Sequence, residues 1–398
     1  MREVSEKTCS MVFFLLVFSI LLSPHLATAD LLVGTDGPPG DGAIRHFNNS
    51  GAYLGDFTSG GPGLDGPATV HFGPDGNLYV LSSSDTVIRY NGSTGVFIDV
   101  FIPTGTAGLD EAKDMVFGPD GNLYIAANEN CFPCDPPLVG EGGRVMRFNG
   151  TTGDYIDDFI PNGAGTGGAN LVAETMSIAF GPDGYFYLGN DARCVLDSNC
   201  NSTAYSVMRF DGTTGAYIDT PFPANAMGLY DPNGMTVGPD CNLYISSEGI
   251  SFTSDGFGTD NPNVIFRLNL TTNSISEFVS SNGLLNNNGP FPPGAGLIEP
   301  EKIVFGPSGD LYVTSGDTAE IYRYKGITGA LIGVFVSQGL GAGTSDPKGI
   351  TFFPGESQTC TAIITKGIPT LSEWGLVSMI GLMGMIGLWV LRSKKATN

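Results

Sequence analysis

The sequence is poor in charge, and poorest in positive charge. Lys and Arg together number 18 against 40 Asp and Glu, so the formal net charge is −22, and charged residues make up 15% of the chain. A surface with so few cations repels nucleic acid and anionic lipid headgroups, which excludes nucleic acid as a partner. The same surface suits calcium, cationic partners or simple solubility.

Two further absences narrow the fold and the chemistry. No stretch before residue 376 repeats apolar residues every 3.6 positions, whereas 58 of the 398 residues are Gly, which favours short strands and turns over helices. No Gly-x-Ser-x-Gly segment occurs, so the nucleophile elbow of an α/β-hydrolase is excluded. After the N-terminal segment the histidines are His46 and His71, and we expect both to pack within strands.

In place of these features the chain carries an internal repeat. The stretch Phe72-Gly-Pro-Asp-Gly-Asn-Leu-Tyr79 indicates the end of one strand, a tight turn and the start of the next. Related copies begin at Phe117, Phe180, Val237 and Phe305, and a partial copy begins at Phe353. Repeats at this period are typical of propellers, in which each unit is one four-stranded blade.

The unit around the first copy predicts the blade. Its four strands are expected at 68–72, 77–81, 86–90 and 95–101. Five units are complete. The sixth is split, with its first strand at 349–353 and the others at 31–35, 43–47 and 52–57. The fold class is therefore an all-β, six-bladed propeller over 30–360, closed by N- and C-terminal strands in one blade, which removes free sheet edges.

An arginine marks the third strand of every unit. These residues are Arg45, Arg89, Arg147, Arg209, Arg267 and Arg323. We expect each long side chain to lie along its blade and pair with a neighbouring carboxylate rather than with a ligand. The repeat as a whole resembles NHL-type and SMP-30/gluconolactonase-like propellers. That resemblance implies a fold, because such propellers include binding proteins and enzymes alike.

Both ends of the chain carry targeting signals. Residues 1–29 combine a short charged region, an apolar stretch and Ala27-Thr28-Ala29, which predicts a secretory signal peptide rather than an anchor helix. After a linker at 361–367, residues 376–391 form an uncharged apolar run followed by a basic tail up to 395. This run is just long enough for a transmembrane helix with its tail in the cytoplasm and the propeller outside.

The stretch before that run has a recognisable sequence. It reads Ile368, Pro369, Thr370, Leu371, Ser372, Glu373, Trp374, Gly375. With the apolar run and basic tail, residues 368–395 resemble the IPTL-CTERM sorting signal of Gram-negative bacteria. The resemblance implies an exosortase-like membrane enzyme as a partner, with cleavage near the motif and cell-surface attachment or release. A plain membrane anchor is the alternative.

Six cysteines follow the signal peptide, an even number in an exported chain, which favours disulfides. Cys131 and Cys134 share one loop and Cys194 and Cys200 share another, so each pair is expected to close its own loop. A redox or zinc role for the first pair has no second C-x-x-C and no nearby His to support it. Cys241 and Cys360 are left, either as two free thiols or as a bridge across the ring.

Candidate ligand residues flank the first and second strands of the units, where loops from several blades meet on one face. Oxygen ligands converging there would suit Ca²⁺, and a solvated acidic rim is the alternative. The candidates are Glu111, Asp114, Glu129, Glu174, Asp191, Asp231, Asn233, Glu248, Glu299, Glu301, Asp317 and Asp346. No cofactor other than Ca²⁺ is indicated, and no residue is assigned to catalysis.

Long loops in three adjacent units, at 127–143, 190–204 and 247–262, would line the same face, as functional loops on a rigid scaffold do; neutral insertion is the alternative. The sequence favours a surface-displayed binding protein with an extracellular ligand or protein partner that it does not name. The alternative is a Ca²⁺-dependent lactonase of the SMP-30 type or a lyase of the streptogramin-lyase type, although the mouth histidine of the latter has no counterpart that we can place.

Overall fold

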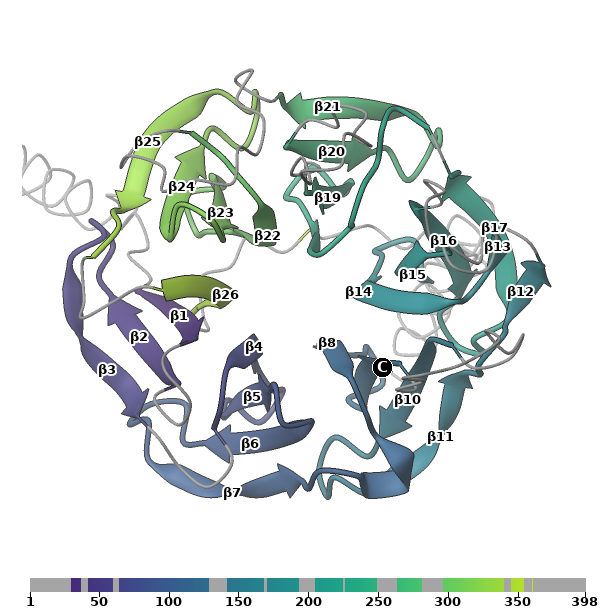
Figure 1. Ribbon diagram of the computed structural model, residues 1–398, viewed down its shortest axis with the longest axis horizontal. Coiled ribbons are helices and arrows are strands. Elements are labelled where there is room, and N and C mark those ends of the chain that lie inside the picture. The colour runs from purple at the N-terminus through teal and green to yellow at the C-terminus, as the bar shows by residue number, and fades with distance from the viewer. Residues whose placement is uncertain are drawn as a thin grey trace, which may run out of the picture. The chain divides into compact units, whose positions relative to one another are not determined.

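The computed structural model confirms a six-bladed β-propeller. The residues that it describes are 30–36, 42–59, 64–128, 142–167, 170–192, 205–224, 226–248, 263–280, 296–339, 345–353 and 360. Six four-stranded antiparallel sheets form a ring (Figure 1), and the first strand of each sheet lies innermost. Among the described residues the one helical element is a single 3-10 turn at Thr106–Gly108.

Five blades take their four strands consecutively from the chain, from the inner strand to the outer one. The first three are β4 (Pro67–Phe72), β5 (Leu78–Ser82), β6 (Thr86–Tyr90) and β7 (Phe97–Ile102); β8 (Ala112–Phe117), β9 (Leu123–Ala127), β10 (Arg144–Phe148) and β11 (Tyr155–Ile160); and β14 (Glu174–Phe180), β15 (Tyr185–Asp191), β16 (Tyr205–Asp211) and β17 (Tyr217–Phe222). A small two-stranded ribbon, β12 (Gly165–Gly167) and β13 (Asn170–Leu171), precedes the third of these blades.

The other two consecutive blades complete most of the ring. They are β18 (Met235–Val237), β19 (Leu243–Ser247), β20 (Val264–Leu268) and β21 (Ile275–Val279), and β22 (Pro300–Phe305), β23 (Leu311–Ser315), β24 (Glu320–Tyr324) and β25 (Leu331–Val336). The sequence predicted strand bounds for the first blade, and β4 to β7 agree with them to within two residues at each end. The differences fall where a strand meets its turn.

The closing blade joins the two ends of the domain, as predicted. Its inner strand is β26 (Ser345–Phe352), and the others are β1 (Leu31–Asp36), β2 (Ala43–Phe47) and β3 (Tyr53–Ser59). Figure 1 shows the yellow-green β26 beside the purple β1. The two strands pair antiparallel from Leu31 opposite Phe352 to Asp36 opposite Ser345. Backbone hydrogen bonds therefore close the ring.

The contacts in the first blade show why the residues of the repeated turn recur. The Asp75 carboxylate accepts hydrogen bonds from the backbone N–H of Asn77 at 3.0 Å, the Asn77 amide at 2.7 Å and the Tyr79 hydroxyl at 3.1 Å. Gly76 between them has a φ of 77°, a left-handed conformation that glycine adopts without a Cβ penalty. One short motif thus fixes the turn and locks a core tyrosine.

The tyrosine of each turn also joins neighbouring blades. Tyr79 is fully buried and packs edge-to-face on Phe101 of its own blade and Phe117 of the next, with ring centroids 5.0 and 4.9 Å apart. Tyr124 repeats this arrangement with Phe159 and Phe180. The hydrophobic core is therefore a set of clusters between successive blades rather than one central mass.

The third-strand arginines pair with carboxylates, as predicted. In four blades the guanidinium meets an aspartate of the outer strand, shown by Arg89 with Asp99 at 2.5 Å. The remaining pairs are Arg147–Asp157, Arg209–Asp219, Arg45–Asp56, Arg323–Asp310 and Arg267–Asp240. The last two use the aspartate of the repeated turn instead. Each arginine therefore pairs within its own blade.

Candidate functional site

The inner strands enclose a cavity of about 360 Å³ on the axis of the ring, here called the central cavity. All six inner strands line it, with residues such as Val70 of β4, Val116 of β8 and Ile350 of β26. A six-bladed ring brings these strands together although they are far apart in the sequence. The walls are largely apolar, so the few polar groups in them decide what the central cavity can do.

One level of the central cavity is built from equivalent positions. In each blade the last residue of the inner strand pairs with the start of the second strand. The equivalent position lies three residues before that last residue. The six residues, here called the polar layer, are Thr69, Asp114, Ser177, Gly234, Lys302 and Gly349, of which Thr69, Asp114, Lys302 and Gly349 line the central cavity. Asp114 and Lys302 come from β8 and β22, which stand three blades apart in a ring of six. Opposite charges therefore face each other across the central cavity.

The two charges meet. The Lys302 ammonium lies 3.1 Å from Asp114 Oδ1, and the two side chains are 15% and 8% exposed. Asp114 also accepts a hydrogen bond from the Thr69 hydroxyl at 3.0 Å and another from the backbone N–H of Ile178 at 3.0 Å. One carboxylate thus contacts β4 and β14 on either side and β22 opposite. Its hydrogen-bonding capacity is largely used by the protein.

Ser177 and Gly234 of the polar layer, together with Ser246 of β19, lie where neighbouring blades meet. The Ser177 hydroxyl donates to the carbonyl of Pro232 at 2.5 Å, and Ser246 donates to the carbonyl of Glu301 at 2.6 Å. A Cβ at Gly234 would lie 2.3 Å from that same carbonyl of Glu301, so glycine is required where the strands approach most closely. The polar layer therefore serves first to hold the inner strands together.

His71 lies within β4, where it was expected, and it also lines the central cavity. Burial lowers the pKa of His71 below its usual value; the Lys302 charge adds to that effect and the Asp114 charge opposes it. The imidazole is therefore neutral at pH 7. His46 behaves as expected of a packing residue, since it contacts the rings of Phe57 and Phe353 and bonds to Asp30 at 2.9 Å.

A second feature lies at the ends of β18, β19 and β22 that are remote from the repeated turns. Four carboxylates, here called the acidic cluster, interact there: Asp231, Glu248, Glu299 and Glu301. Burial and the other three charges raise the pKa of Glu248 to about 8. Asn233 donates to Glu248 Oε2 at 2.8 Å, and Lys348 lies 3.3 Å from Glu301. Glu248 is therefore largely protonated at neutral pH.

The remaining candidates do not join the acidic cluster. Glu111 lies 3.9 Å from Lys113, and both side chains are more than a third exposed. Glu174 and Asp191 face each other across β14 and β15, Asp317 is exposed, and Asp346 is on β26. Within the described part of the chain, no three or more His, Cys, Asp or Glu side chains are arranged to hold a metal ion. Convergence from several blades onto one Ca²⁺ site is not seen there.

Several predictions fall on residues that the structure does not describe. They include Glu129, the cysteines Cys131, Cys134, Cys194 and Cys200, most of the three long loops, the signal peptide at 1–29 and the segment from 361 onward. In the described ranges no helix has the length and apolar character needed to cross a membrane. The segment expected to do so, 376–391, lies outside those ranges.

Sequence reasoning missed Lys302 and His71 as cavity residues. A signal for Lys302 was present, because counting three residues back from Phe72, Phe117 and Phe305 gives Thr69, Asp114 and Lys302. The approach of Asp114 to Lys302 depends on the number of blades, which determines which inner strands lie opposite each other.

Comparison with known proteins matches these observations at the level of fold and signal. A family model of the IPTL-CTERM motif matches residues 366–393. A chain of a nidogen/laminin complex is 13% identical with a TM-score of 0.55, over 82% of this chain and 98% of that one. A protein of unknown function from Bacteroides caccae is 13% identical with a TM-score of 0.51, over 83% and 100%.

A putative 6-phosphogluconolactonase from Bacteroides uniformis is 15% identical with a TM-score of 0.48, over 82% of this chain and 99% of that one. No curated protein sequence matches the chain. At these identities the solved structures establish the fold alone. The chain is a six-bladed β-propeller, and its residues 366–393 match the IPTL-CTERM motif. That motif implies sorting by an exosortase-type system and suggests an exported cell-surface protein.

Proposed function

We propose that this protein is a surface-displayed binding protein that engages its partner without chemical turnover. The observation that carries the proposal is the pairing of Asp114 with Lys302 at 3.1 Å. The described charges that line the central cavity, Asp114 and Lys302, pair with each other. Asp114 also accepts hydrogen bonds from Thr69 and from the backbone N–H of Ile178, which supports a structural role for this carboxylate.

The acidic cluster supports a cationic ligand or a cationic patch on a partner protein. Burial and three neighbouring carboxylates raise the pKa of Glu248 to about 8, and these carboxylates make the local potential negative. An approaching cation would stabilise the ionised form of Glu248 and be attracted by the net charge of −22. Binding should therefore weaken as salt is added.

A lysine-rich oligopeptide is a suitable probe for this proposal. We expect the exported protein to bind it measurably at low salt, and Glu299→Gln with Glu301→Gln to weaken binding at least threefold. Asp317→Asn is the matched control, because Asp317 is an exposed carboxylate outside the acidic cluster. Equal binding by all three proteins, or no salt dependence, would contradict the proposed cationic ligand.

The second candidate is a Ca²⁺-dependent lactonase or lyase. The raised pKa of Glu248 favours it in one respect, because carboxyl groups with perturbed pKa values are common at functional sites. The test is a panel of lactones and cyclic depsipeptides with and without added Ca²⁺. Turnover that EDTA abolishes would replace the binding proposal with this one.

Processing at the C-terminus completes the proposed function. If the exosortase-type system cleaves near residues 368–375, mass spectrometry of surface-exposed protein should find no peptide beyond that stretch. Recovery of peptides containing Lys394 and Lys395 from mature surface protein would instead support an uncleaved membrane anchor.

A further inference from the structure

The chain is joined to itself across the ring after its last strand. Cys360 follows the end of β26 by eight residues and forms a disulfide with Cys241, whose Cα lies 5.1 Å from that of Cys360. Cys241 is in the turn between β18 and β19. The blade β22–β25 stands between that blade and the closing blade. The bond therefore attaches the chain after the closing blade to the blade β18–β21, which is not its direct neighbour in the ring.

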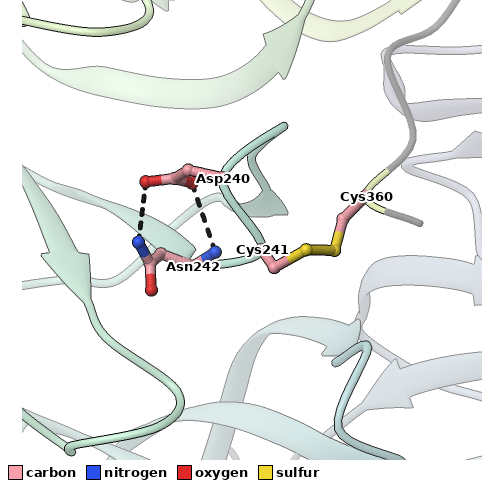
Figure 2. The surroundings of a disulfide bond; sticks show 4 residues. All are labelled: Asp240, Cys241, Asn242 and Cys360. Carbon is pink, nitrogen blue, oxygen red and sulfur yellow. Dashed lines mark hydrogen bonds between the residues drawn. A yellow bond between two sulfur atoms is a disulfide. The ribbon is translucent and has the colours of Figure 1, made fainter. Parts of the chain in front are cut away.

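The position of Cys241 suits this purpose. Four other repeated turns have glycine at the equivalent place, Gly76, Gly121, Gly184 and Gly309, with φ between 77° and 84°. Cys241 keeps the left-handed conformation with a φ of 63°, which is unfavourable for a residue with a Cβ. The turn is otherwise unchanged, because Asp240 still accepts from the amide and backbone N–H of Asn242 (Figure 2).

The equivalent turns also show that the side chain has room. A Cβ added at Gly76, Gly121 or Gly309 would meet nothing within 4 Å. A side chain at this place points away from the packed blade and is accessible to a segment that passes over this face. Cysteine at this place therefore strains the backbone of the turn, and it forms a covalent bond that no other described turn makes.

The closing strand has only non-covalent attachments of its own. β26 pairs with β1, and the residue after it, Phe353, contacts the rings of His46, Phe57 and Phe72. The backbone N–H of Phe353 donates to the carbonyl of Asp30 at 3.1 Å. Tension applied to the chain just beyond Phe353 would break these contacts one after another and open the ring from its end.

We propose that the Cys241–Cys360 disulfide is a force-bearing clasp that protects the closure of the propeller. Tension on the C-terminal sorting segment enters the ring at Cys360 and passes through the disulfide into the turn between β18 and β19. The chain between Phe353 and Cys360 is then unloaded, and β26 remains paired with β1. The clasp also holds together the 119-residue span between the two cysteines, which contains β19 to β26.

Single-molecule pulling on the full exported chain tests the clasp. Handles are placed at the N-terminus of the secreted protein and in the linker at 361–367, and the oxidised protein is compared with Cys241→Gly/Cys360→Ser. The glycine restores the residue that the other turns carry, so this variant should fold. We expect the oxidised protein to unfold with an extension shorter by roughly 400 Å, which is the contour length of 119 residues at about 3.4 Å each.

The order of events provides the second readout. In the variant, detachment of β26 should appear as a separate first step at lower force, and dithiothreitol should give the oxidised protein the same trace. An equal first rupture force with and without the bond would overturn the clasp, as would release of the full length by the oxidised protein. Neither readout depends on the ligand, so failure of the binding proposal would leave this test intact.

Discussion

Lys302 and Asp114 form an ion pair across the central cavity, 3.1 Å apart, from inner strands that stand opposite each other in the ring. The pair therefore connects two inner strands on opposite sides of the ring. Because both side chains are mostly buried, removing one charge leaves the other desolvated without its partner.

The first prediction follows from that pair. Lys302→Met should lower the free energy of unfolding by about 3 kcal/mol, because Asp114 then keeps a buried charge. Adding Asp114→Asn should recover part of the loss. Urea denaturation measures both, and Lys113→Met is the control, since Lys113 and Glu111 are exposed and 3.9 Å apart. A loss below about 0.5 kcal/mol, the usual range for exposed sites, would show that the pair adds nothing to the ring.

The second prediction separates two reasons for glycine, at Gly76 in a repeated turn and at Gly150 in the turn between β10 and β11. A Cβ at Gly150 would lie 1.8 Å from the carbonyl oxygen of Gly121, whereas a Cβ at Gly76 would meet nothing within 4 Å but has a φ of 77°. Gly150→Ala should therefore cost about 3 kcal/mol through overpacking, and Gly76→Ala about 1 kcal/mol through backbone strain. Thermal unfolding of the two variants compares them, and the reverse order would refute the packing of one turn on the other.

The third prediction concerns pH. The pKa of Glu248 is raised from 4.5 to about 8 in the folded protein, so the folded state binds more protons than the unfolded state between those values. Its contribution to stability is complete below pH 4.5 and is lost as the pH rises through 8.

Glu248→Gln removes that titration, so between pH 5 and pH 9 the variant should gain about 4 kcal/mol relative to the native protein. Urea denaturation at both pH values provides the measurement. Glu277→Gln, which alters an exposed carboxylate of the same blade, should leave the pH dependence as it was. Parallel pH profiles for the native protein and Glu248→Gln would disprove the crowding of the acidic cluster.

The fourth prediction concerns the equilibrium effect of the disulfide. Closing a loop of 119 residues restricts the unfolded chain, so Cys360→Ser should lower the free energy of unfolding by up to about 4 kcal/mol. In Cys241→Gly the same loss should be offset by about 1 kcal/mol, because glycine relieves the left-handed turn. Guanidinium denaturation of both variants tests this, and identical stability of the native protein and Cys360→Ser would count against the bond.

The sequence alone determined the blades, because each turn is a local interaction. Asp75 binds Asn77 and Tyr79 within four residues, and Gly76 supplies the one conformation that other residues disfavour, so the pattern of residue types implies the geometry. Counting the copies gave the number of blades and the split sixth blade. The IPTL-CTERM motif was likewise legible as a contiguous string.

The tertiary structure decided which of these residues meet. Asp114 and Lys302 are 188 positions apart in the sequence, and only closure into six blades places them opposite each other. Glu248 joins Asp231, Glu299 and Glu301, while Glu111 and Asp317 stay apart, because two adjacent blades bring the former group together. Local hydrogen bonds act over a few residues and can be read from them. Contacts across the ring depend on the angle between blades, which no local pattern specifies.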